Sequence, residues 1–433
     1  MRYLPLSKYK YAVQNGDDPW VNVENEYQSR LNSYAVQKTA LFPLLTYRNE
    51  SQTSKYPIFF LPLPEILELA DQFRLNSKRI EDLAMQLPGL AINQFLNSLL
   101  VSEIFYTNDI EGVKTSKIEI GTVIQENSLK VNGKETTSKR RLGSTIKLYQ
   151  QTQLGKPIQI QTLADFRKIY DRLLKGELTK NRLPNGELFR DRLPNGESLT
   201  ISSSTGVVVH RPPADEEKIQ QALSTLIEFM NDDTTPALYK ALITHFFFEN
   251  THPFLDGNGR MGRYLLSSYI STKYDRFTGF SVATAIHAHV QKYYKDFVEA
   301  DHAENRADLT LFIQSLLAIL ISQQQENITN LSRAKAELDA AKDTINRWTE
   351  ENKESFPNKT DLKLVKQTLF YLAQSKLFSY QPALGIKDNE IIESNKRNGF
   401  PMAKTRRTLD LLTDCGAIQL ISKKPKQHEI TII

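Results

Sequence analysis

The chain has 433 residues, enough for two or three domains, and its 40% hydrophobic and 24% charged content is ordinary for a globular protein. A net charge of +5 permits an acidic partner without requiring one, and the single Cys415 excludes both an intramolecular disulfide and a cysteine-based zinc site. The first residues lack the apolar core of a signal peptide, and the longest apolar run, 309–321, is too short to cross a bilayer. We therefore expect a cytoplasmic protein with no membrane partner.

The first third of the chain predicts an irregular segment followed by two helices. Residues 1–60 are polar and rich in tyrosine, and we expect irregular structure there. Apolar spacing predicts helices at 64–85 and 91–112, with Gly112 in a left-handed cap. Asp109 and Glu111 stand at the negative end of the second helix dipole, where basic residues are favoured. Glu111 is therefore either an ordinary solvated acid or one that is held there to meet a cation from elsewhere.

The middle of the chain contains a local duplication. The segment 181–187, Asn-Arg-Leu-Pro-Asn-Gly-Glu, is nearly repeated at 191–197, and each Pro-Asn-Gly is a turn signal. Two units are too few for a solenoid, so we interpret the repeat as a surface loop. Residues 199–210 predict a β-hairpin, and helices are expected at 160–175 and 216–230.

Two apolar segments, 237–250 and 264–270, predict helices that flank a loop. The intervening sequence is His252-Pro253-Phe254-Leu255-Asp256-Gly257-Asn258-Gly259-Arg260-Met261-Gly262-Arg263. Pro253 disfavours the α conformation at His252, so the first helix should end there. Gly257 and Gly259 permit the positive φ angles of an anion-binding loop. The second helix should begin near Gly259, with its N–H groups directed into the loop.

The charges around this loop are typical of a nucleotide site. Arg260 and Arg263 oppose the helix macrodipole by ~0.3–1 kcal/mol each, which is understandable if a polyanion binds over that end. Asp256 beside the loop could hold a divalent metal on the phosphates. His252 stands at the other end of the loop, where it could act as a general base.

The C-terminal part predicts a connecting helix and a small separate domain. Helices are expected at 283–301 and 308–322, and apolar residues at heptad spacing indicate a connecting helix over 323–355. Helices at 361–376, 387–395 and 402–413, followed by strands at 417–422 and 428–433, predict a winged-helix domain over 356–433. Lys404, Arg406 and Arg407 lie on its third helix. Both DNA binding and protein docking remain open for this domain.

Residues 252–263 match the Fic family signature His-Pro-Phe-x-Asp/Glu-Gly-Asn-Gly-Arg-x-x-Arg at every specified position. Residues 107–112 resemble the Ser/Thr-x-x-x-Glu-Gly/Asn inhibitory motif of family members that carry it before the core. The hairpin at 199–210 lies where the target-aligning flap of the family lies. The resemblance to the Fic (Fido) family covers roughly 60–322. It implies a mainly α fold: a Fic-type helical core over 61–322 with a β-hairpin flap, accompanied by a C-terminal winged helix.

The resemblance also implies an activity, which is the transfer of AMP from ATP, with Mg²⁺, to a Tyr, Thr or Ser hydroxyl of a protein. His252 would be the base and Asp256 the metal ligand. Arg263 would fix the γ-phosphate, and Glu111 would inhibit by pairing with Arg263. The implied nucleotide-binding residues are Gly257, Asn258, Gly259, Arg260, Gly262, Arg263 and Tyr294. Relatives that transfer phosphate carry Lys in place of Gly259, so the glycine favours AMP transfer.

Other functions remain open at this stage. The protein could be a winged-helix DNA-binding regulator whose Fic core senses nucleotide or modifies itself. The same site could instead remove AMP from a protein, with Glu111 activating water. The sequence does not identify the target protein, and it leaves a homodimer open. His245, seven residues before the signature, is expected to be a core histidine.

Overall fold

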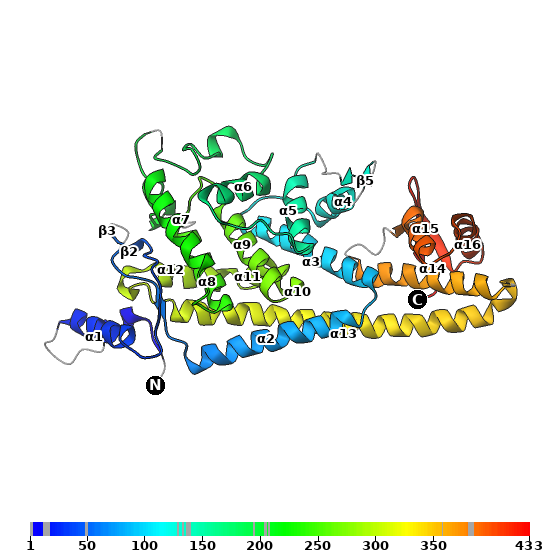
Figure 1. The fold of residues 1–433 in the computed structure, drawn as a ribbon, viewed down its shortest axis with the longest axis horizontal. Coiled ribbons are helices and arrows are strands. Elements are labelled where there is room, and N and C mark those ends of the chain that lie inside the picture. Colours follow the sequence, from blue (N-terminus) through cyan, green and yellow to red (C-terminus); the bar gives the residue numbers. More distant parts are fainter. Residues whose placement is uncertain are drawn as a thin grey trace. The chain divides into compact units, whose positions relative to one another are not determined.

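The computed structural model describes residues 3–11, 18–47, 51–127, 130–131, 134–135, 140–193, 195–202, 206, 208–356, 358–379 and 385–433. The protein is mainly helical (Figure 1). It divides into two compact units, one of Met1–Ser77 with Ser102–Gln325 and the other of Lys78–Val101 with Glu326–Ile433. The chain passes between the units inside the helices α2 (Pro64–Met85), α3 (Gly89–Ile110) and α13 (Thr310–Glu351). No helix in the described ranges combines the length and apolarity that a membrane span requires.

The first unit begins with a small N-terminal region that is more ordered than predicted. It contains η1 (Leu6–Tyr11), α1 (Pro19–Leu31), β1 (Gln37–Lys38), β2 (Leu45–Tyr47), β3 (Ser51–Thr53) and β4 (Phe59–Phe60). Asp18 caps α1 by accepting a hydrogen bond from the Trp20 amide. The expectation of irregular structure over 1–60 is therefore wrong for this helix. Only Val23 and Tyr27 provide its buried apolar contacts, too few to show a helical period in the sequence.

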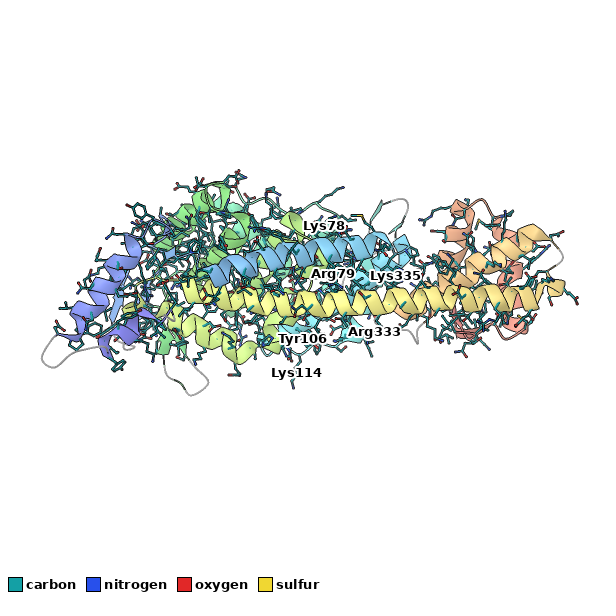
Figure 2. The ribbon with its side chains drawn as sticks, turned by 90° about the horizontal axis from the view of Figure 1, so that it is seen from below. Lys78, Arg79, Tyr106, Lys114, Arg333 and Lys335 are labelled. Carbon is teal, nitrogen blue, oxygen red and sulfur yellow. The ribbon has the colours of Figure 1, made fainter. Side chains whose placement is uncertain are left out.

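Helices α2 and α13 lie side by side within the first unit (Figures 1 and 2), where the Gln324 amide donates to the Phe73 carbonyl and to Ser77. The predicted bounds of α2 are confirmed, and α3 begins and ends within two residues of its prediction. The two helices predicted at 308–322 and 323–355 are one helix, α13. No proline or glycine interrupts the sequence between 310 and 351, so the helix has no reason to end.

The core of the first unit is a set of helices with two short hairpins. Its elements are α4 (Lys117–Asn127), α5 (Gly143–Gln153), α6 (Leu163–Leu173), η2 (Lys180–Arg182), α7 (Glu216–Asn231), α8 (Ala237–Thr251), α9 (Asn258–Lys273), α10 (Arg276–Gly279), α11 (Val282–Ala288), α12 (Val290–Asp301) and η3 (Ala303–Asn305). The hairpins pair β5 (Lys130–Val131) with β6 (Lys134–Glu135) and β7 (Ile201–Ser202) with β8 (Val208–His210). Helix α8 is buried almost all round, as predicted, and packs between α7 and α9.

One of two predictions for this core is confirmed and the other is wrong. The hairpin expected at 199–210 is confirmed by the pairing of Ile201 with His210, although 203–205 and 207 lie outside the described residues. The single helix predicted over 283–301 is wrong. The chain leaves helical geometry at His289, where φ is −127° and ψ is 27°, so α11 and α12 are separate.

The second unit contains the three predicted C-terminal helices and the predicted hairpin. Its elements after α13 are η4 (Lys353–Ser355), α14 (Lys359–Phe378), β9 (Ile386–Lys387), α15 (Asp388–Arg397), α16 (Met402–Asp414), β10 (Ile418–Lys423) and β11 (Lys426–Ile430). The sheet has the order β10-β11-β9, and the two-residue strand β9 was not predicted. Lys78 on α2 and Lys335 on α13, both labelled in Figure 2, each form an i,i+4 ion pair with an aspartate.

Candidate active site

The loop between α8 and α9 lies where its sequence predicts, and of the two glycines expected to permit a positive φ, Gly257 adopts one whereas Gly259 is helical. Helix α8 ends at His252, whose φ of 47° is left-handed and whose N–H donates to the Phe248 carbonyl. Gly257, with φ 84°, precedes α9, which begins at Asn258, one residue before the predicted start. The Asn258 side chain accepts from the Phe254 amide at 2.9 Å and donates to the Phe254 carbonyl at 2.8 Å. Asn258 therefore closes the loop, and its contact with phosphate stays a prediction.

Arg190 holds this loop from a distant part of the chain, and sequence reasoning missed it. Its side chain is fully buried, and its Nε donates to the His252 carbonyl at 2.7 Å. Its backbone amide donates to the Pro253 carbonyl at 2.9 Å. The segment before it is fixed in turn because the carboxylate of Glu216 accepts from the amides of 187–189. Only the position of Arg190, directly after Leu188-Phe189 and the first repeat, could have drawn attention to it.

His252 is half-buried on the wall of a cavity, with its backbone fixed by these contacts. Burial lowers the pKa of His252, and the nearby charges of His210 and Arg190 act in the same direction. The ring is therefore neutral near pH 7 and able to accept a proton. His210 is itself fixed, because its ring nitrogens contact Asp301 Oδ2 and the Asn250 carbonyl, both at 2.7 Å.

Arg263 and Glu111 form an ion pair in this cavity. Arg263 Nη2 donates to Glu111 Oε1 at 2.6 Å, and Arg263 Nε donates to Thr107 Oγ1 at 2.9 Å. The Arg263 side chain is 2% exposed and the Glu111 side chain 27%. A Cβ at Gly259 would lie 2.2 Å from Glu111 Oε1, so the glycine makes room for the carboxylate. Glu111 is thus held by a cation from another helix and is not a simple solvated acid.

Arg260 and Asp256 also have partners of opposite charge. Arg260 Nη1 donates to Glu177 Oε2 at 2.9 Å, and both side chains are 5% exposed. Burial raises the pKa of Glu177, although Arg260 opposes that shift. Asp256 Oδ2 accepts from Arg182 Nη1 at 2.8 Å, and its other oxygen lies 3.7 Å from Arg260. Glu177 and Arg182 were not predicted, because Glu177 carries no motif and the repeat that contains Arg182 was interpreted only as a surface loop.

The cavity has a volume of about 670 Å³ and brings together five of the predicted site residues. Four of them are Glu111, His252, Gly259 and Arg263. Tyr294, 45% exposed, is the fifth, and the lining also includes the apolar residues Phe246, Phe297 and Val298. A cavity lined by both charged and apolar residues suits a ligand that joins phosphates to an aromatic base.

The other predicted site residues lie outside the lining of this cavity. Gly257 stands against Leu174, and a Cβ at Gly262 would lie 2.1 Å from Glu249 Oε1, so helix packing accounts for this glycine. The expected nucleotide contact of Gly262 stays a prediction. His245 is buried, as predicted.

Asp256 is the candidate metal ligand. The described residues contain no group of three or more His, Cys, Asp or Glu side chains that could hold a metal ion. One carboxylate fits Mg²⁺ nevertheless, because this ion usually binds one or two carboxylates and completes its shell with substrate phosphates and water. Asp256 is 25% exposed and its present partner, Arg182, is 64% exposed, so the carboxylate is accessible.

A mainly helical core with a loop of this sequence between two buried helices defines the Fic fold class. Residues 160–270 match the Fic/DOC family, and the chain therefore contains a Fic/DOC family domain. The chain is similar over 85% of its length to a Fic family protein from Desulfovibrio desulfuricans, of which the match covers 96%, with 16% sequence identity and a TM-score of 0.47. It is also similar to a Fic domain containing signaling protein from Bacteroides thetaiotaomicron, with 15% identity, a TM-score of 0.40, and coverage of 59% and 98%. It is similar as well to Fic-1 from C. elegans, with 20% identity, a TM-score of 0.38, and coverage of 62% of this chain and 74% of that one.

Proposed function

We propose that this protein transfers AMP from ATP to a Tyr, Thr or Ser hydroxyl of a protein, and that Glu111 limits this reaction in the resting chain. The observation that carries the proposal is the single cavity lined by His252, Gly259, Arg263 and Glu111. Gly259 lies in the first turn of α9, where N–H groups favour phosphate. The aromatic and aliphatic residues of the lining can take the nucleobase.

His252 performs the proton transfer in this proposal. The hydroxyl oxygen of the target forms a bond to the α-phosphorus of ATP, the bond to the leaving pyrophosphate breaks, and the hydroxyl proton passes to the His252 ring. The lowered pKa of His252 keeps the ring neutral before the reaction. Arg190 and His210 act as positioning residues, because Arg190 binds the His252 carbonyl and His210 binds the carbonyl of Asn250 in the last turn of α8.

Asp256 and Arg260 bind the phosphates. A magnesium ion held by Asp256 would neutralise phosphate charge and orient the leaving group. Asp256 must leave Arg182 to bind that ion, and Arg260 can turn from Asp256 toward the phosphates while Glu177 supports its other side. Nothing in these rearrangements requires the backbone of the loop to move.

The inhibitory part of the proposal follows from the pairing of Arg263. A γ-phosphate that binds Arg263 has to replace the Glu111 carboxylate, because the two negative groups would occupy the same side of the guanidinium. The resting chain therefore binds ATP with its γ-phosphate displaced, and its α-phosphorus is poorly aligned for attack.

Intact-mass measurement of the purified protein with ATP and MgCl₂ tests the proposal. The expected result is a mass increase of one AMP on the Glu111→Gly protein or on a candidate partner, and none with His252→Ala. The absence of an AMP adduct on the folded Glu111→Gly protein and on every protein of an extract from its native cell would refute the proposed function.

A second candidate function, DNA binding, is favoured by the exposed basic residues of the second unit. Arg406 and Arg407 on α16 are exposed, as are Lys423, Lys424 and Lys426 at the hairpin. These positions fit a winged helix that places α16 in a groove. Lys404, the third basic residue predicted to contact DNA, instead pairs with Asp361 at 2.5 Å. This pairing reduces the charge available to DNA.

A salt titration of DNA binding tests this second candidate. If α16 contacts phosphates, changing Arg406 and Arg407 together to Ala should reduce the salt slope by ~2, since each lost phosphate contact reduces it by about 1. Lys335→Ala, on α13 of the same unit, is the control and should leave the slope unchanged. No measurable DNA affinity of the parent protein would reject this function and leave protein docking as the role of the domain.

A further inference from the structure

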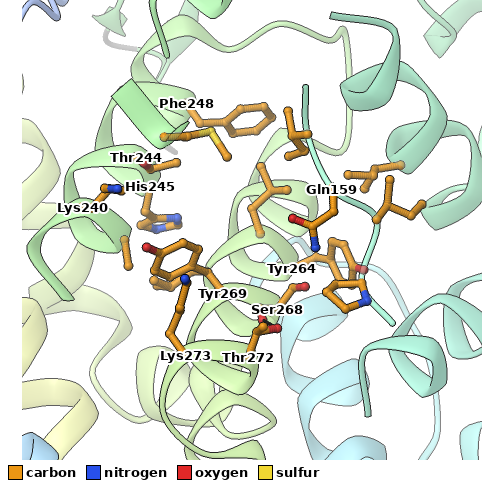
Figure 3. Close-up of a pocket in the computed structure, with 18 of the residues that line it drawn as sticks. Gln159, Lys240, Thr244, His245, Phe248, Tyr264, Ser268, Tyr269, Thr272 and Lys273 are labelled. Atoms are coloured by element: carbon orange, nitrogen blue, oxygen red, sulfur yellow. Dashed lines mark hydrogen bonds between the residues drawn. The ribbon is translucent and has the colours of Figure 1, made fainter. Parts of the chain in front are cut away.

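A second cavity, of about 280 Å³, lies between α8, α9 and the segment before α6, within the first unit (Figure 3). Its lining shares no residue with the lining of the catalytic cavity among the described parts of the chain. One side of it is polar. Figure 3 shows Lys240 and His245 from α8 gathered with Tyr269 and Lys273 from α9 on this side. Two cations and two polar rings on one wall favour an anionic ligand.

Lys240 is the strongest indication of a ligand. Its side chain is 3% exposed, and within the described residues its ammonium has one ion-pair partner, Asp233 Oδ1 at 3.5 Å. The Asp233 side chain is fully exposed, so this contact is long and open to water. An ammonium has three donors, and a buried charge is costly unless it is paired and hydrogen-bonded. A bound anion would supply the acceptors that Lys240 lacks.

The two polar rings beside Lys240 are neutral. Burial lowers the pKa of His245 to about 3, with a further contribution from the charge of Arg263. Burial raises the pKa of Tyr269 to about 12. Nδ1 of His245 is buried and has no hydrogen-bond partner within the described residues. Both rings can therefore hydrogen-bond a ligand without adding charge.

The charge balance and the apolar lining residues define the ligand further. Among the lining residues, Lys240 and Lys273 against Asp233 leave one net positive charge, and Asp232, outside the lining, also attracts Lys240. This modest positive charge suits a monoanion better than a nucleotide with several phosphate charges. The remaining wall includes the apolar side chains of Ile158, Ile160, Met230, Phe248 and Leu265. The volume is just below the usual range for ligand sites, ~300–1,000 Å³, so the ligand should be of small-metabolite size.

We propose that this cavity binds a small monoanion with an apolar body, of the chemistry of a short-chain carboxylate, and that its occupation changes nucleotide binding in the catalytic cavity. The two cavities are connected through one buried contact, because His245 Nε2 lies 2.8 Å from the hydroxyl of Tyr293. His245 lines the second cavity and Tyr293 lines the catalytic one. A ligand that hydrogen-bonds His245 Nδ1 fixes the tautomer of the ring and so the direction of this contact. The coupling rests on the proposed function, whereas the binding does not.

Calorimetry on the full chain tests the binding, with sodium hexanoate as the probe. Hexanoate should bind saturably at one site, and n-hexanol should bind at least ~10-fold more weakly, because it loses the charge-assisted hydrogen bond to lysine. Inorganic phosphate should also bind more weakly than hexanoate, because it has no apolar body to bury against the apolar lining residues. Lys240→Met should weaken hexanoate binding to a similar degree, and His252→Ala, in the other cavity, should leave it unchanged. If Lys240→Met does not fold, Lys273→Gln is the second variant, because Lys273 is exposed. The proposal would be overturned if hexanoate showed no saturable binding, or if hexanoate and hexanol bound with equal affinity. It would also be overturned if the lysine variants bound hexanoate as tightly as the parent.

The coupling is tested by the affinity for ATP with and without saturating hexanoate. The parent should show a change of ~5-fold or more, the lower end of ordinary coupling between sites. Tyr293→Phe removes the hydroxyl that contacts His245, so it should retain hexanoate binding and lose the change. An ATP affinity that is the same at zero and saturating hexanoate would refute the coupling. A parent that binds hexanoate but not ATP would refute the proposed function and leave the second site standing.

Discussion

Glu111→Gly is the substitution that tests the resting state most directly. It removes the carboxylate that accepts from Arg263 at 2.6 Å. A fully buried ion pair costs ~3–5 kcal/mol to break by removing one partner, but Glu111 is 27% exposed, so we use the ~1.5–3 kcal/mol of a charge-assisted hydrogen bond. The γ-phosphate of ATP no longer competes with this contact in the variant. At 1.4 kcal/mol per tenfold change, productive ATP binding and self-labelling at limiting ATP should rise by ~10–100-fold.

The assay is the initial rate of AMP incorporation, measured by intact mass at limiting ATP with MgCl₂. Asp109→Gly is a matched control, because Asp109 lies at the same helix end but contacts His287 and not Arg263. The control should label at the parent rate. Without ATP, Glu111→Gly should also unfold at a lower temperature than the parent, because Arg263 stays buried, loses its ion pair and keeps its hydrogen bonds to Thr107.

Two results would refute this reasoning. A Glu111→Gly protein that is folded, binds ATP and labels no faster than the parent would show that the pair with Arg263 does not limit the reaction. An equal acceleration by Asp109→Gly would show that loosening of the end of α3, and not loss of the ion pair, releases activity.

Further substitutions test the remaining parts of the site. His252→Ala should abolish transfer while calorimetry still detects ATP binding, and normal labelling by this variant would exclude His252 as the base. Burial lowers the pKa of His252, so the ring stays neutral as the pH falls through the ordinary histidine pKa of ~6.5. The activity of the parent should therefore persist below pH ~6.5. A loss of activity centred at that pH would contradict the lowered pKa of His252. Arg182→Ala should tighten Mn²⁺ binding by up to ~5-fold, because Arg182 forms an ion pair with the Asp256 carboxylate that would bind the metal. Arg192 is the counterpart of Arg182 in the repeat and pairs with Asp215, so Arg192→Ala should leave Mn²⁺ affinity unchanged. Equal effects of the two substitutions would refute competition between Arg182 and the metal. Gly259→Ala should lower the unfolding temperature of the parent, and it should lower that of the Glu111→Gly protein by less. The coupling free energy in this double-mutant cycle should be ~0.5–3 kcal/mol. Additive effects of the two substitutions would show that Gly259 does not make room for Glu111.

Local sequence signals predicted the elements that position the catalytic loop. The apolar run of α8, Pro253 after His252 and the glycine at 257 fixed where one helix ends and the next begins. The unfavourable charge of Glu111 at a helix C-terminus indicated two alternatives, a solvated acid or one held by a cation, and the family resemblance pointed to Arg263, with which the structure pairs it. These predictions succeeded because backbone preference and helix electrostatics act over a few residues.

Contacts between distant segments could not be predicted in the same way. Arg190 supports the His252 carbonyl from 62 positions away, and Glu177 pairs with Arg260 across 83. Neither residue has a periodic or a composition signal, because a single buried charge leaves no pattern in its own neighbourhood. Helix α1 was missed for a related reason, since its contacts with the rest of the first unit stabilise it more than its own weak apolar stripe.

The resting site keeps every charge that we assign to phosphate or metal binding in contact with an opposite charge of the protein. Arg263 contacts Glu111, Arg260 contacts Glu177, and Asp256 contacts Arg182. This pairing avoids the desolvation penalty of two buried, unpaired arginines, so the loop can be preformed without ligand. The three pairs differ in exposure, however, and so in how readily a ligand replaces them. Arg260 and Glu177 are both 5% exposed and should stay together, while the Glu111 and Arg182 partners reach solvent and can leave when phosphate and metal arrive. A ligand can therefore replace the exposed partners, Glu111 and Arg182, while the buried pair of Arg260 and Glu177 keeps the loop in place.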